Sequence, residues 1–364
     1  MCTSLLYRDT SSRAYLGRTL ELSLELPYQI AFCPRALEFT SATDGHPALT
    51  WTGRQSFVAV TMPATPFAPG TSFAPSDLKV VEGINDAGLT FSMQSYPQAA
   101  GPVAPPAPQQ AVLSAADLGA WVLSQFSAAA DVKAAIAAQP IVLPPIPILG
   151  GLEVPFHFTV HDTGGASLVI EFHQGVLTLY DNPVGVMTNA PQFSWHLTNL
   201  NNYTFLTNVD HSTATFGSYA AVQPGSGIAK AGLPGTDTSV DRFIRASFYA
   251  QFAEKQADPD RAVQMVAHIM NNFDRPRGIT VDYPGKGSGH LSVEGVKLAS
   301  IPTEFTSWTS ISDLSRKLFF IRDSRGMNYV CLSVDELAQA GFRTMPMARL
   351  MPGVQDATAM LAAA

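Results

Sequence analysis

The chain has 364 residues, of which 46% are hydrophobic and only 14% are charged. At about 150 residues per domain this length fits one large domain or roughly two smaller ones, and the composition excludes a disordered protein. The 22 basic residues against 29 acidic ones give a formal net charge of −7, which argues against nucleic acid or an anionic membrane as a partner. The apolar runs are short or broken by proline, so no membrane span is predicted.

The first third of the chain favours β-strands. A hairpin is predicted from residues 5–7 and 14–20 around a polar turn at 9–12, with further strands at 56–62 and 78–93. Residues 89–116 contain no charged side chain, and the proline-rich stretch 97–108 within them predicts an irregular loop. That loop would be either a solvated excursion or a lid over an apolar substrate pocket.

Helices and strands alternate in blocks through the rest of the chain. Ser114 and Asp117 form a capping-box pattern before a helix that runs to Phe126, and a second helix is expected from 129 to just before Pro140. Strands are then predicted at 156–161, 167–171, 176–180 and 184–188, helices near 241–255 and 259–272, and strands at 305–312, 317–321 and 327–332. This order predicts a single α+β domain, residues 1–364, with antiparallel sheets covered by helices.

Several common catalytic and cofactor motifs are absent from the sequence. It contains neither a Gly-x-Ser-x-Gly elbow nor a Gly-rich phosphate loop ending in Lys-Ser or Lys-Thr. The three cysteines form no CxxC pair, and Cys33 and Cys331 are expected to be buried and inert. His157 and His161 lie four residues apart on a predicted strand without a carboxylate in a metal-ligand pattern. Neither a metal nor a cofactor is therefore predicted.

The amino terminus, Met1-Cys2-Thr3-Ser4, carries no secretory signal pattern. This favours the cytoplasm, or the periplasm if the numbering starts at a mature end. Since an initiator methionine is normally removed before a small residue, Met1 is expected to leave and Cys2 to gain a free α-amine. An α-amine titrates near about pH 8 and a thiol near about 8.5, so the neutral amine can take the thiol proton. The alternative is an ordinary small residue at position 2.

Four stretches of the chain contain motifs that point to a known family. They are Met1-Cys2-Thr3 with Gly17–Glu21, then Glu82–Leu89, then Val186–Pro191 with Trp195 and Asn199–Asn201, and finally Gly232–Gly235 with Asp241–Arg245. In this order they resemble the choloylglycine hydrolases, N-terminal nucleophile hydrolases that include bile salt hydrolases and penicillin V acylases. The resemblance extends over nearly the whole length. It implies a four-layer αββα sandwich with two antiparallel sheets, and a cofactor-free hydrolase of linear amide C–N bonds.

The resemblance also implies a role for each matching residue. Cys2 would be the nucleophile, and Arg18 would lie beside its sulfur and favour the thiolate by its positive charge. Asn189 would donate its side-chain amide to the oxyanion of the tetrahedral intermediate. Arg242 would complete the polar network around the amine and the cleaved bond. A surface or structural ion pair is the alternative role for each of the two arginines.

Two positions depart from the family pattern. Glu21 stands where the family usually has aspartate; it can still accept a hydrogen bond from the Cys2 amine, but its carboxylate reaches one methylene further. Ser95 stands where bile salt hydrolases tend to have asparagine and many penicillin acylases tyrosine, although its backbone N–H can still serve the oxyanion hole. These departures favour a penicillin V acylase-like enzyme or an N-acyl homoserine lactone acylase over a conjugated bile salt hydrolase.

The predicted reaction is acyl transfer through a thioester on Cys2, which water then hydrolyses. The charge-free stretch 89–116 indicates a small-molecule N-acyl amide with an apolar acyl group as the substrate. The resemblance also implies a homotetramer. The alternative from another class is a catalytically inactive binding or scaffold protein that retains the fold.

Overall fold

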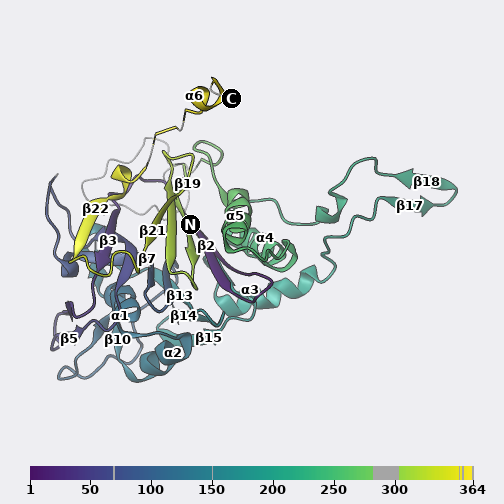
Figure 1. Cartoon of the computed structure of the whole chain (residues 1–364). Coiled ribbons are helices and arrows are strands. Elements are labelled where there is room, and N and C mark those ends of the chain that lie inside the picture. Colours follow the sequence, from purple (N-terminus) through teal and green to yellow (C-terminus); the bar gives the residue numbers. More distant parts are fainter. Residues whose placement is uncertain (69, 150, 282–302, 352, 355, 363–364) are drawn as a thin grey trace.

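The computed structural model describes residues 1–68, 70–149, 151–281, 303–351, 353–354 and 356–362. Two antiparallel sheets lie face to face, with helices α4 and α5 on one side and α1 and α2 on the other (Figure 1). This is the α+β, four-layer αββα arrangement that the resemblance implies. Among the described residues, no helix has the length and apolar character needed to cross a bilayer.

The six-stranded sheet contains the amino terminus, and its strand order is β16-β1-β2-β19-β20-β21. Its strands are β1 (Cys2–Arg8), β2 (Ala14–Leu22), β16 (Val186–Met187), β19 (Phe305–Asp313), β20 (Leu318–Asp323) and β21 (Val330–Ser333). The predicted hairpin of β1 and β2 is confirmed, and its register pairs Cys2 with Leu20 and Ser4 with Arg18. Hydrogen-bonded neighbours on both sides hold this hairpin inside the sheet.

The eight-stranded sheet has the order β15-β14-β13-β8-β7-β6-β3-β22. Its strands are β3 (Gln29–Cys33), β6 (Phe57–Pro63), β7 (Leu78–Asn85), β8 (Thr90–Ser95), β13 (Phe156–His161), β14 (Ser167–His173), β15 (Val176–Asp181) and β22 (Arg343–Pro346). Strands β3 and β22 have no predicted counterpart, because β3 is buried throughout and shows no alternation, while β22 is a short edge strand. The predicted segment 78–93 is two strands, joined by a turn in which Gly88 has a φ of +78°.

Short strand pairs and helices complete the chain. The short strands are β4 (Glu38–Ser41), β5 (Leu49–Thr52), β9 (Leu113–Ser114), β10 (Ile141–Val142), β11 (Pro145–Ile146), β12 (Leu152–Glu153), β17 (Thr213–Phe216) and β18 (Tyr219–Val222). The helices are α1 (Leu118–Gln125), α2 (Ala129–Ala138), α3 (Phe193–Leu200), α4 (Ser239–Phe252), α5 (Pro259–Met270) and α6 (Thr358–Ala362). Helix α3 was not expected from the sequence, and the β17–β18 hairpin extends well away from the body of the molecule (Figure 1).

Alternation along β1 assigns its side chains to two different layers. Leu5 and Tyr7 pack with the helices α4 and α5, whereas Cys2 belongs to the cluster that lies between the two sheets. Helix α5 approaches β2 closely at Gly17, where an added Cβ would lie 2.7 Å from a methyl group of Val266. The hairpin therefore needs glycine at this position to let the helix cover it.

Three local expectations need correction. Ser114 caps the turn before α1 through the N–H of Ala116, while Asp117 accepts from Ser41 Oγ at 2.8 Å and pairs with Lys79 instead of closing a capping box. The strand expected at 184–188 is only Val186–Met187. Cys331 is exposed rather than buried, because it lies on the edge strand β21.

Candidate functional site

Cys2 begins strand β1, and its side chain points into the space between the sheets. The Cys2 sulfur lies 3.5 Å from Nη2 of Arg18, which stands on the neighbouring strand β2. The Cys2 backbone N–H donates to Oδ1 of Asn189 at 2.8 Å. Two predicted site residues that are far apart in the sequence therefore meet at Cys2, one at its sulfur and one at its nitrogen.

Arg18 is completely buried between the two sheets, where its guanidinium has partners on several sides. Nη1 donates to Oε2 of Glu82 and to the carbonyl of Val81, both at 3.0 Å, and Nη2 also donates to the carbonyl of Met93. The guanidinium lies over the ring of Trp308, 4.7 Å from its centroid. These contacts hold a positive charge against the Cys2 sulfur.

Glu82 is a member of the site that the sequence analysis missed. It is fully buried on β7, directly behind Arg18. Burial raises the pKa of Glu82 to about 7, although the positive charge of Arg18 opposes this shift. The signal for it was the acidic residue at the start of the Glu82–Leu89 motif, which the sequence analysis used only to establish the resemblance.

Asn189 follows the edge strand β16 and faces the start of β1. Its Oδ1 accepts from Cys2 N and from Nη2 of Arg242, each at 2.8 Å, and its Nδ2 donates to the carbonyl of Ser95 at 2.8 Å. Ser239 Oγ accepts from the Asn189 backbone N–H at 2.8 Å. A carboxamide nitrogen carries two hydrogens, so Nδ2 has a second N–H beyond the one donated to Ser95.

Arg242 lies in the first turn of α4, a helix capped by the Thr238 hydroxyl, which accepts from Asp241 N. Ser239, Arg242 and Phe243 share the buried face of this helix because they are three and four residues apart. The Arg242 side chain is fully buried and donates to the Cys2 carbonyl, and to Thr3 Oγ1 at 2.7 Å.

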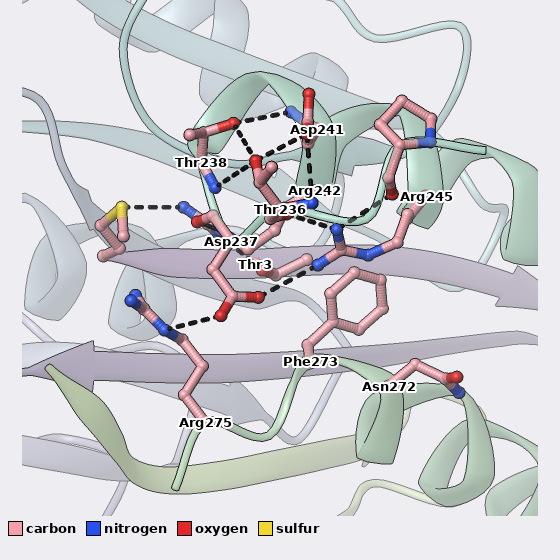
Figure 2. Close-up of polar contacts among 12 residues, drawn as sticks. Thr3, Thr236, Asp237, Thr238, Asp241, Arg242, Arg245, Asn272, Phe273 and Arg275 are labelled. Atoms are coloured by element: carbon pink, nitrogen blue, oxygen red, sulfur yellow. Dashed lines mark hydrogen bonds and ion pairs between the residues drawn. The ribbon is translucent and has the colours of Figure 1, made fainter. Parts of the chain in front are cut away.

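A second layer of charges surrounds Arg242 (Figure 2). The carboxylate of Asp237 lies between Arg245 and Arg275, at 3.4 Å from a nitrogen of each. Arg275 also pairs with Glu304 at 2.7 Å. The backbone carbonyl of Asp237 accepts from Nε of Arg242 at 2.9 Å, so this cluster fixes the arginine that contacts Cys2.

Glu21 lies on the helix-facing side of β2, fully buried. Burial raises its pKa, and the nearby charge of Arg242 opposes the increase. With Met1 in place, the backbone carbonyl of Glu21 accepts from the Met1 amine, and a Glu21 carboxylate oxygen lies 3.5 Å from Thr306 Oγ1. The acceptor nearest to Cys2 N is the oxygen of Asn189, and not the Glu21 carboxylate.

A cavity of about 80 Å³ opens beside Cys2. Its walls are almost entirely apolar and include Tyr28, Met93, Ile148 and Phe156, and Met1 also lines it. Lys79 is the one charged side chain in the wall, and its ammonium group is bound to Asp117. A larger cavity of about 560 Å³, beside α4 and the β16 edge, contains none of the predicted site residues.

The proline-rich stretch 97–108 forms no helix or strand, which confirms the expected loop. It is attached to the β14–β15 hairpin by an isolated bridge between Ala99 and His173 and by the Val103 N–H, which donates to the Gly175 carbonyl at 3.1 Å. No residue of this stretch lines the cavity beside Cys2. The possible lid over the substrate thus gains no support. Within the described part of the chain, no three His, Cys, Asp or Glu side chains are grouped as metal ligands would be.

Comparison with known proteins identifies the family. The profile of the linear amide C–N hydrolases of the choloylglycine hydrolase family matches residues 2–343. The chain belongs to this family. Its members hydrolyse linear amides, so the protein is a hydrolase of this class, as the resemblance implied.

The relatives of this choloylglycine hydrolase family member include bile salt hydrolases and a penicillin V acylase. It is 28% identical to a bile salt hydrolase/transferase of Clostridium perfringens over 281 residues, covering 77% of this chain and 81% of the relative. It is 25% identical to a penicillin V acylase of Pectobacterium atrosepticum, covering 73% and 63%. The crystal structure of the C2A mutant of conjugated bile acid hydrolase from C. perfringens superposes with a TM-score of 0.79 at 22% identity, over 98% of this chain and 99% of that one. This last comparison shows a shared fold.

Proposed function

We propose that this protein hydrolyses N-acylated amines through an acyl thioester on Cys2, after removal of Met1. One observation carries the proposal: Arg18 lies 3.5 Å from the Cys2 sulfur, while Asn189 lies 2.8 Å from its nitrogen. A fixed positive charge beside the sulfur favours the nucleophilic thiolate. An acceptor at the nitrogen orients the group that would become the α-amine and act as the base.

The reaction begins when the α-amine of Cys2 takes the thiol proton and the sulfur attacks the amide carbonyl carbon. The charge that develops on the carbonyl oxygen is stabilised by the second N–H of Asn189 Nδ2 and by the Ser95 backbone N–H. The protonated amine then gives its proton to the leaving nitrogen as the C–N bond breaks. Water attacks the resulting thioester, the same amine accepts its proton, and the thiol and a carboxylic acid are released.

Arg242 and Glu21 set the charge around the proposed base. Arg242 contacts both the Cys2 carbonyl and Asn189 Oδ1, which fixes the acceptor of the Cys2 nitrogen. Glu21 is a buried acid on the helix-facing side of β2, and burial raises its pKa. The positive charge of Arg242 opposes that shift and so favours the carboxylate, the form that offsets the charge of the arginine.

The apolar cavity supports a substrate with an apolar acyl group. Pockets that enclose drug-sized ligands hold about 300–1,000 Å³; the cavity of about 80 Å³ has Met1 in its wall, and removal of Met1 would enlarge it beside Cys2. The apolar wall, together with the departures from the family pattern at Glu21 and Ser95, favours phenoxyacetyl penicillins or N-acyl homoserine lactones as substrates. Conjugated bile salts are the second candidate, because several relatives carry the name bile salt hydrolase.

The proposal is tested by kcat/KM on penicillin V, a long-chain N-acyl homoserine lactone and glycocholate, with intact mass to detect an acyl group on Cys2. We expect turnover of one of the first two substrates, complete loss in Cys2→Ala, and retention in the matched control Cys33→Ala. Turnover of glycocholate alone would establish the second candidate. Equal activity in Cys2→Ala would refute the mechanism, and no turnover of any amide by the wild type would favour the scaffold alternative.

A further inference from the structure

The segment that contains Asn189 follows the end of the edge strand β16. Strand β16 pairs with β1 only at Val186 and Met187, so the sheet itself does not hold Thr188 and Asn189. Side chains bind this backbone instead. The Thr188 carbonyl accepts from His157 Nε2 at 3.1 Å and from Gln94 Nε2 at 3.2 Å, and the Asn189 carbonyl meets His196 Nε2 at 2.8 Å.

His157 is fully buried on β13, with partners at both ring nitrogens. Because a carbonyl oxygen only accepts, Nε2 must carry the hydrogen that reaches Thr188. Nδ1 lies 3.2 Å from Oε2 of Glu171. The ring stacks on Tyr96 with 4.7 Å between centroids and 9° between planes, which fixes its orientation.

Glu171 connects this histidine to the start of helix α3. Its two carboxylate oxygens lie 3.2 and 3.3 Å from the backbone N–H of Phe193, the first residue of α3. A single proton between Glu171 and His157 Nδ1 completes their hydrogen bond, whichever of the two groups holds it. The carboxyl therefore ties β13 to α3.

Helix α3 supplies the second histidine of the network. His196 stacks on Phe243, with 4.6 Å between ring centroids, and is fully buried. Burial lowers the pKa of His196 to about 4, although its hydrogen bond to the Asn189 carbonyl opposes the shift. The ring is therefore neutral near pH 7, and its single proton is on Nε2, where it is donated to Asn189.

We propose that His157 with Glu171, and His196, are positioning residues that hold the backbone of Thr188 and Asn189 and so aim the Asn189 carboxamide at Cys2. The two histidines contact this backbone and Glu171 contacts His157, whereas none of the three contacts a reacting group. The inference rests on the proposed role of Asn189 in stabilising the oxyanion. The position of the Asn189 donor then depends on strands β13 and β14 of the eight-stranded sheet and on helix α3.

The first test compares His157→Phe with His161→Phe. His161 is an equally buried histidine four residues along β13, and neither of its ring nitrogens has a hydrogen-bond partner among the described residues. His157→Phe should lower kcat by about 10²-fold, the cost of a small misplacement, with little change in KM. His161→Phe should keep kcat, and both variants should react with iodoacetamide at Cys2 at the wild-type rate. An equal loss of kcat in the two variants would overturn the proposal, as would a parallel loss of alkylation.

The second test uses the carboxyl group. Glu171→Gln retains an oxygen for Phe193 N–H and an N–H for His157 Nδ1, so kcat should stay close to wild type, whereas Glu171→Ala should behave like His157→Phe. Equal activity of these two Glu171 variants, whether high or low, would refute the network. Cys2→Ala separates this result from failure of the mechanism, because its full activity would reject the proposed function whatever the histidines do.

Discussion

The two halves of the site are held in different ways. Cys2 and Arg18 stand on adjacent antiparallel strands, where the register Cys2–Leu20 and Ser4–Arg18 fixes their relation. Asn189 lies just after the end of the edge strand β16, and Arg242 lies on helix α4. Buried side-chain hydrogen bonds hold both of them in position. Hydrogen bonds between paired strands persist when a side chain elsewhere is replaced. A buried network of side chains, in contrast, loses its geometry when one of its members is removed. The backbone positions of Cys2 and Arg18 should therefore withstand the loss of one supporting side chain better than the position of Asn189 does.

The largest effect should come from blocking the amine on the strand side. A glutamate inserted between Met1 and Cys2 would prevent removal of Met1, so the Cys2 nitrogen would remain an amide without a basic lone pair. Loss of a general base costs about 10² to 10⁴-fold in rate. We expect kcat/KM to fall by this amount, with retention of Met1 checked by intact mass. Protease cleavage that leaves Cys2 at the new terminus should restore activity; full activity with Met1 retained would contradict the mechanism.

The next largest effect should come from Asn189 on the other side. Asn189→Ala removes the proposed oxyanion donor, which typically costs about 10² to 10³-fold in kcat. KM should change much less, since the donor acts chiefly in the transition state. The matched variant Ser239→Ala removes the acceptor of the Asn189 backbone N–H and a partner of the Thr188 hydroxyl, but it leaves the Asn189 carboxamide in place and should lose less. A rise in KM with unchanged kcat would show that Asn189 binds substrate and does not stabilise the oxyanion.

A smaller effect on stability should come from Glu82, which supports Arg18. Its pKa is raised by burial from 4.5 to about 7, so between these values the folded protein holds a proton that the unfolded chain has lost. The free energy of unfolding should thus fall as the pH rises through this window, by roughly 3 kcal/mol from this carboxyl. Urea unfolding at about pH 5 and about pH 8 should show this fall in the wild type and a smaller one in Glu82→Gln. The same pH dependence in both would contradict the assignment.

The smallest effect on catalysis is expected at the β17–β18 hairpin, which extends far from the amino terminus (Figure 1). Phe216 and Tyr219 are each 69% exposed there, a large apolar area for a monomer surface. If the chain forms the tetramer implied by the resemblance, replacing both residues by serine should reduce the mass measured by light scattering and keep kcat/KM within about twofold. An unchanged mass would show that this hairpin does not hold an assembly together.

Sequence reasoning found the elements with strong periodicity and the residues that carry reactive chemistry. It predicted the β1–β2 hairpin and the α4 and α5 helices, and it selected Cys2, Arg18, Asn189 and Arg242, which the structure brings together. It could not find Glu82 as the partner of Arg18, or His157 as the partner of Thr188. Those contacts depend on how two sheets stack, and no local pattern encodes which side chains will face each other across that interface.

Part of the wall of the cavity beside Cys2 comes from a segment outside the two main sheets, and this bears on how substrate preference can change in evolution. Ile146, Ile148 and Leu149 come from a short strand and a single 3₁₀ turn outside the two main sheets, while the reactive groups are anchored elsewhere. Replacing these three side chains can reshape the space proposed for the acyl group and leave Cys2 undisturbed. Selectivity and reactivity can accordingly evolve as independent traits in descendants of one ancestral scaffold.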